Sequence, residues 1–135
     1  MVTMATPQLC LDSDVIIDYL RRRDNVLERA LSRFNCALTA VTVYELEIGL
    51  FRSPRQSTLF TDLLGIIAVL PLNYEAAHAA AQVHERLRGQ GLLIGVQDTL
   101  IAGTCIAHGL PLLTRNVEHY GRIGGLTIVE AEQVP

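Results

Sequence analysis

The sequence has 135 residues, of which 50% are apolar and 19% are charged, and its formal net charge is −3. This length and apolar content fit one compact domain over residues 1–135. All 11 basic residues are arginines, which excludes chemistry that needs lysine, such as a Schiff-base nucleophile or a Walker-type phosphate loop. The mild acidity also excludes a protein that binds nucleic acid through its net charge alone.

Short apolar runs alternate with longer segments of helical period. In chain order, the pattern predicts a strand at 8–11, helices at 14–23 and 25–34, a strand at 36–40, helices at 45–50 and 58–64, a strand at 66–72, helices at 74–88 and 97–107, and strands at 110–114 and 126–129. Strands separated by helices imply right-handed crossovers. We therefore expect an α/β fold of three layers, α/β/α, around a central, mainly parallel five-stranded sheet.

Three cysteines, Cys10, Cys36 and Cys105, are widely spaced among apolar neighbours and form no C-x-x-C pair. This pattern predicts buried free thiols in a reducing compartment, so we expect a cytoplasmic protein. The longest stretch without Asp, Glu or Arg, residues 99–114, is shorter than the about 20 residues that a membrane-spanning helix needs. We therefore expect no membrane span.

Polar residues follow or flank the predicted strands. Asp12 follows the first strand, Glu45 lies in the first turns after the second, Asp98 opens the helix before the fourth, and Asn116 follows the fourth. Ligands bind beyond the carboxyl ends of parallel strands, and buried carboxylates need donors or a cation. Arg115 is the only arginine close to any of these acids in the sequence. The sequence therefore predicts that the carboxylate oxygens bind a divalent metal, Mg²⁺ or Mn²⁺.

Each of these acids also has a simpler structural explanation when it is taken singly. Asp12 or Asp14 could cap the first helix, and Asp98 could be an acid favoured by a helix N-terminus. Glu45 stands at capping-box distance from Thr42, which is predicted to cap its helix. All of these explanations would have to coincide at one end of one sheet, which favours a shared site.

Four motifs resemble those of PIN-domain ribonucleases of the VapC toxin family. The run LDSDVIIDYL at 11–20 resembles the family's opening motif, and TAVTVYEL at 39–46 with Gly49 resembles the second, acidic motif. Ile94-Gly95 through Asp98 resembles the third motif, and LLTRN at 112–116 followed by Tyr120 resembles the fourth. The resemblance runs in order along nearly the whole chain.

This resemblance implies a PIN-like domain that acts as a Mg²⁺-dependent endoribonuclease, the toxin of a type II toxin–antitoxin pair. It implies Asp12, Glu45 and Asp98 as metal carboxylates and Asn116 as the less uniform fourth catalytic position. RNA as substrate, a small cognate antitoxin whose C-terminal segment covers the groove, and a homodimer are implied as partners. Arginine–carboxylate pairing with the antitoxin is physically sensible at such a site.

Further residues near the motifs are candidates for ligands or substrate contacts. Family members often carry acids where this chain has Asn116 or His119, so the fourth metal ligand could be Glu118, Asp14 or a water held by Asn116. The residues that could orient ligands, touch substrate or contact phosphate are Ser13, Thr114, Arg115 and His119.

Three consecutive arginines, Arg21, Arg22 and Arg23, are predicted to close the last turn of the first helix, where the dipole favours cations. They are a candidate RNA-binding patch, and the alternative is a solvated helix end.

Two other functions compete with a nuclease. Asp12-x-Asp14 after a first strand imitates the nucleophile motif of haloacid-dehalogenase-like phosphatases, although Ile16 replaces the threonine expected there. A catalytically silent PIN-like interaction module would keep the fold without the metal.

Overall fold

The computed structural model describes residues 6–135, so the first five residues of the predicted single domain lie outside it. Five parallel strands form one sheet in the order β3-β2-β1-β4-β5. They are β1 (Leu9–Leu11), β2 (Cys36–Thr39), β3 (Ala68–Leu70), β4 (Leu112–Leu113) and β5 (Ile128–Val129). The predicted three-layer α/β/α fold is confirmed, and the sheet is parallel throughout.

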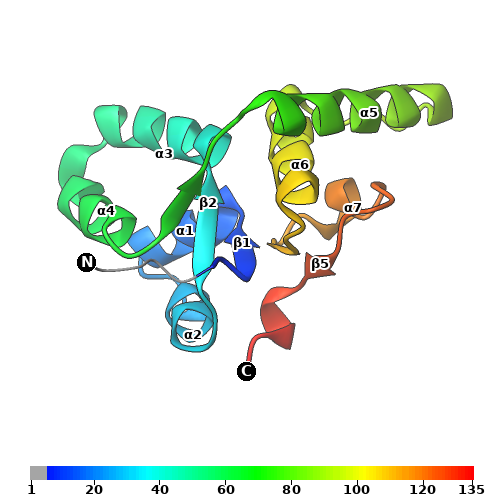
Figure 1. The fold of residues 1–135 in the computed structure, drawn as a ribbon. Helices are drawn as coiled ribbons and strands as arrows, with labels where there is room; N and C mark the ends of the chain where they lie inside the picture. The colour runs from blue at the N-terminus through cyan, green and yellow to red at the C-terminus, as the bar shows by residue number, and fades with distance from the viewer. Residues whose placement is uncertain (1–5) are drawn as a thin grey trace.

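Helices cover both faces of this sheet. They are α1 (Ser13–Leu20), α2 (Val26–Arg33), α3 (Ala40–Arg52), α4 (Ser57–Leu64), α5 (Tyr74–Gln90), α6 (Val96–His108) and α7 (Val117–Tyr120), with 3-10 turns at Pro54–Gln56 and Ala131–Gln133. Figure 1 shows α5, α6 and α7 to one side of the strands and α3 and α4 to the other. The short α7 and the two 3-10 turns were not predicted, because a single turn carries no apolar period.

The alternating side chains of the strands build two cores. In β1, Leu9 and Leu11 pack into the core beneath α1 to α4, whereas Cys10 packs into the core beneath α5 and α6. All three cysteines are buried and free, as predicted. None of the helices in residues 6–135 is both long and apolar enough to cross a bilayer.

The predicted cap of α3 is wrong by one turn. The Thr39 hydroxyl, not Thr42, caps the helix, and it accepts the Thr42 main-chain N–H at 3.0 Å. The cause lies in the sheet, because β2 continues to Thr39, opposite Leu70, and α3 begins at the next residue. Glu45 therefore lies in the second turn of α3, which excludes its capping-box role.

Two other predicted boundaries are also corrected. Helix α1 ends at Leu20, so Arg21, Arg22 and Arg23 lie in the turn that follows it and not in its last turn. Strand β3 spans only Ala68–Leu70 of the predicted 66–72. By contrast, Gly91 and Gly109 end α5 and α6 with φ of 69° and 66°, as the glycines at those helix ends predicted.

A close crossing with α5 fixes the position of α6, the helix that carries Asp98. A Cβ atom built on Gly103 of α6 would lie 2.5 Å from the Cα atom of Ala80 on α5. Only a glycine allows this approach, so the distance between the two helices depends on Gly103.

Candidate active site

Adjacent central strands bring Asp12 and Thr114 side by side. β1 and β4 are parallel neighbours, and these two residues directly follow their last paired positions. The Thr114 hydroxyl lies 2.7 Å from Asp12 Oδ2, to which it donates, and the Ser13 main-chain N–H donates to Asp12 Oδ1 at 2.8 Å. Asp12 therefore caps α1, as one structural explanation held, and it also faces the end of the sheet.

The charge on Asp12 is poorly compensated. The residue is 4% exposed. The pKa of Asp12 is raised from 3.8 to about 7, mainly by burial and then by the carboxylates of Asp14 and Asp98, although its two hydrogen bonds lower it. A cation placed here would offset the cost of ionising the group.

Two further carboxylates each carry a buried oxygen atom that has no hydrogen-bond partner in the described chain, Asp14 Oδ1 and Glu45 Oε1. Burial raises the pKa of both groups, and Asp98 adds to the effect at Glu45. The other oxygen of Asp14 accepts the Arg115 main-chain N–H at 3.0 Å. Buried carboxylate oxygens without donors are sites at which a cation is favourable.

Asp98 is held by residues of the short helix α7. The buried Tyr120 hydroxyl donates to Asp98 Oδ1 at 3.1 Å, and Asp98 Oδ2 lies 3.5 Å from Nδ1 of His119. The same nitrogen lies 3.1 Å from Nδ2 of Asn116. The phenol of Tyr120 stays protonated, because burial and then Asp12 and Asp98 raise its pKa. Tyr120 thus contacts the candidate site, a role that sequence reasoning missed, although the fourth motif included this residue.

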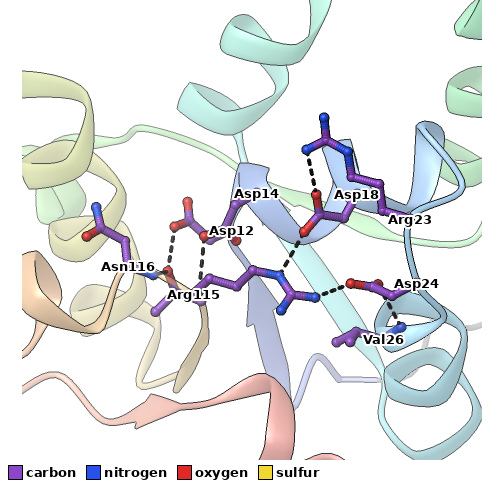
Figure 2. A network of polar contacts seen from close by, with 9 residues as sticks. Asp12, Asp14, Asp18, Arg23, Asp24, Val26, Arg115 and Asn116 are labelled. Carbon is purple, nitrogen blue, oxygen red and sulfur yellow. Dashed lines mark hydrogen bonds and ion pairs between the residues drawn. The ribbon is translucent and has the colours of Figure 1, made fainter.

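Arg115 does not neutralise the central carboxylates. Figure 2 shows its guanidinium turned away from Asp12 and toward Asp18 and Asp24. Its Nε atom lies 2.8 Å from Asp18 Oδ2, and a terminal nitrogen pairs with Asp24. These two partners lie about 90 to 100 positions away in the chain, so no sequence pattern revealed them.

Residues 9–125 match the family model of the PIN domain. Ribonuclease VapC1 of Rickettsia felis is 30% identical over 128 residues, which cover 90% of this chain and 94% of that protein. The chain belongs to the VapC group of PIN domains. A second relative of the VapC group, the tRNA(fMet)-specific endonuclease VapC of Shigella flexneri, is 30% identical over 121 residues, which cover 86% of this chain and 92% of that protein.

Solved VapC-containing structures share this fold. VapBC2 from Rickettsia felis, bound to a DNA fragment from their promoter, matches with a TM-score of 0.82 and 21% identity, covering 90% of this chain and 97% of that chain. VapBC-1 from nontypeable Haemophilus influenzae also matches with a TM-score of 0.82, at 24% identity, covering 92% of this chain and 98% of that chain. At these identities, the similarity shows the fold.

The four predicted catalytic positions lie near the carboxyl edge of the sheet. The charge of Asp98 raises the pKa of both Asp12 and Glu45. Asn116 contacts His119, which in turn lies beside Asp98. Glu118 differs, because its side chain is 84% exposed and lies 3.7 Å from Arg122. Among the described residues, the structure therefore shows no contact that brings Glu118 to the central acids.

The donor set fits a divalent cation. Asp12, Glu45 and Asp98 offer hard oxygen ligands, and the buried Oε1 atom of Glu45 has no donor within the described part of the chain. Within residues 6–135 no three acidic, histidine or cysteine side chains already surround one point closely enough to hold an ion. A cation held by Asp12, Glu45 and Asp98 together would therefore require their side chains to move closer to one another.

Proposed function

We propose that this chain is a divalent-metal-dependent endoribonuclease, the toxin of a toxin–antitoxin pair. The observation that carries the proposal is a buried carboxylate, Asp12, close to the partly buried and mutually repelling carboxylates of Glu45 and Asp98, while the nearest arginine, Arg115, pairs with other acids. The names of the VapC relatives, ribonuclease and endonuclease, support the same reaction class. The substrate proposed is RNA.

Asp12, Glu45 and Asp98 would hold Mg²⁺ or Mn²⁺, and Asn116 or Asp14 would supply a further ligand directly or through water. When bound, the ion supplies Lewis-acid stabilisation of the phosphate charge and lowers the pKa of the attacking water.

Neighbouring residues orient these ligands. Thr114 and Ser13 fix the two oxygens of Asp12, and Tyr120 fixes one oxygen of Asp98. Such contacts hold carboxylates in the orientation that a metal requires. His119 lies beside Asp98, at a place from which it can contact the substrate.

The implied partners belong to the same proposal. Related structures are described as VapBC or toxin–antitoxin complexes, which supports a small antitoxin as a partner of this chain. The homodimer and the cytoplasmic location stay predictions. The phosphatase alternative loses its support, because the chain is a PIN domain and Ile16, at the position expected for threonine, is a fully buried hydrocarbon.

RNA cleavage with and without a chelator tests this proposal against a catalytically silent module. The parent is expected to cleave a bulk RNA substrate in Mg²⁺, and both EDTA and Asp12→Ala should abolish cleavage. Asp62→Ala removes an exposed acid on α4 and is the matched control, which should leave the rate unchanged. Equal cleavage by the parent and Asp12→Ala would show that the proposed chemistry is wrong.

A further inference from the structure

Arginines gather where α1 and α3 end. The turn after α1 and the 3-10 turn after α3 are in contact, since Gln56 Nε2 donates to the main-chain oxygen of Leu20 at 2.6 Å. These two segments and the last residue of α3 carry nearly half of the protein's 11 arginines. This arginine cluster, all of whose side chains are exposed, comprises Arg21, Arg22, Arg23, Arg52 and Arg55.

Arg22 occupies a backbone position that favours glycine. Its φ is 55°, and among the described residues no other non-glycine residue has a positive φ. The main-chain N–H of Arg22 donates to the Tyr19 carbonyl oxygen at 3.0 Å, and that of Arg23 donates to the Asp18 carbonyl oxygen at 2.8 Å. These two bonds form the Schellman motif, in which a residue in the left-handed conformation ends an α-helix. An arginine there costs stability that a glycine would not, so its side chain is expected to serve a purpose outside the fold.

Most arginines of the cluster form no ion pair within the described residues. Of its five members, Arg23 has an ion pair within residues 6–135, with Asp18 at 3.5 Å. The nearby acids Asp18 and Asp24 are both bound by Arg115, so they do not neutralise the rest of the cluster. An exposed group of unpaired arginines attracts a polyanion.

A groove of about 170 Å³, with apolar side chains such as Ile17 and Leu46 along it, runs between Arg21 of the cluster and Glu45 of the candidate active site. It lies between α1 and α3, with Arg21, Ser53 and Gln56 on its wall near the helix ends and Glu45 near the start of α3. Both helices begin at the carboxyl edge of the sheet, where the catalytic acids lie, and run away from it. Glu45 and Arg52 are seven helical residues apart, a distance of about 10 Å along α3.

We propose that the arginine cluster binds the backbone phosphates of the RNA strand a few nucleotides from the cleaved bond, with the strand following the groove to Glu45. The inference rests on the proposed function and adds the path of the substrate. Guanidinium groups bind phosphate oxygens with two parallel hydrogen bonds, which suits a contact without sequence preference. An acidic segment of a protein partner is the competing occupant, and the test below separates the two.

The test measures binding of a fluorescein-labelled single-stranded RNA by anisotropy, in EDTA and at about 0.1 M salt. Each lost phosphate contact removes roughly 0.7 from the salt slope, which is about fivefold in affinity at this salt concentration. Arg22→Gly should therefore bind about fivefold more weakly while its Tm rises by about 3 °C, because the strain is relieved. Arg22→Lys keeps the charge but not the paired hydrogen bonds, so it should lose less affinity than Arg22→Gly, without raising Tm.

A double variant, Arg52→Gln with Arg55→Gln, should weaken binding about 25-fold, as two contacts are lost. The matched control is Arg33→Gln, which removes an exposed arginine at the end of α2 and should bind RNA like the parent.

Unchanged RNA affinity in both Arg22→Gly and the double variant would overturn the proposed path. Substitutions that weaken binding of the antitoxin but leave RNA affinity unchanged would also overturn it. If the parent still cleaves RNA in either case, the proposed function stands and only the arginine cluster is refuted. A parent that binds labelled RNA but never cleaves it would instead refute the proposed function.

Discussion

Asp12→Asn is expected to make the metal-free protein more stable at pH 8 while it abolishes RNA cleavage. Asp12 is 4% exposed, and the pKa of its carboxyl lies at about 7 instead of 3.8 because of burial and of Asp14 beside it. An asparagine has almost the same shape, carries no charge and can still accept the Ser13 N–H. The substitution therefore removes an electrostatic cost and keeps the packing.

The magnitude follows from the pKa shift. One pKa unit corresponds to about 1.4 kcal/mol, so raising the pKa from 3.8 to about 7 opposes folding by about 4 kcal/mol above pH 7. The hydrogen bond that Thr114 donates to Asp12, worth about 1 kcal/mol, is lost in the variant. The expected gain is about 3 kcal/mol at pH 8, or about 10 °C in Tm.

The sign of the pH dependence is fixed by the direction of the shift. The folded state holds the proton of Asp12 more tightly than the unfolded state does, so the parent loses stability as pH rises from about 4 to about 7. At pH 5 the folded carboxyl is protonated and the cost is smaller. The advantage of Asp12→Asn should therefore shrink to less than about 1 kcal/mol at pH 5.

Urea unfolding in EDTA at pH 8 and pH 5, followed by circular dichroism, measures both values. Asp62→Asn, at an exposed position on α4, is the control and should change the free energy of unfolding by no more than about 0.5 kcal/mol. If Asp12→Asn is no more stable than the parent at pH 8, the charge of Asp12 is compensated in the folded protein, and the electrostatic reasoning for a cation fails.

Three further substitutions test separate parts of the structure. Tyr120→Phe removes the hydrogen bond to the Asp98 carboxylate and should lower the kcat of cleavage by about tenfold or more with an unchanged KM. An unchanged kcat would show that this contact does not orient a metal ligand. Thr114→Val removes a donor that lowers the pKa of Asp12, so the pH profile of cleavage should move to higher pH, whereas an identical profile would contradict the assigned contact. Gly103→Ala should lower the free energy of unfolding by about 2 kcal/mol, measured in urea, because the added methyl group meets the backbone of α5; Gly89→Ala, with open space around it, should not.

The sequence was sufficient to predict that Asp12 and Thr114 lie at the same edge of the sheet. Asp12 and Thr114 follow strands that pair in parallel, and such strands end on the same side. Asp98 could be placed there through its motif. The prediction succeeded because these positions depend on strand order and on short loops.

Local ambiguity limited the prediction of α3. Thr39 and Thr42 are equally good capping residues, and only the pairing of β2 with β3 selects Thr39. The result matters for the site, because it moves Glu45 into the second turn, where one of its oxygens is buried without a donor in the part of the chain that is described.

Long-range pairing limited the prediction of charge. The sequence places Arg115 beside the candidate metal-binding acids, yet its guanidinium binds Asp18 and Asp24. The contact of Tyr120 with Asp98 likewise depends on how the short helix α7 packs against α6. These contacts join residues without any regular spacing, so only the folded structure reveals them.

The most direct test of the central claim is a calorimetric titration of the protein with Mn²⁺ in the absence of RNA. If Asp12, Glu45 and Asp98 share one ion, the parent should bind Mn²⁺ at one site, and Glu45→Gln and Asp98→Asn should each weaken binding by about 100-fold, with Asp62→Asn unchanged. Binding of equal strength in the parent, Glu45→Gln and Asp98→Asn would contradict the shared site.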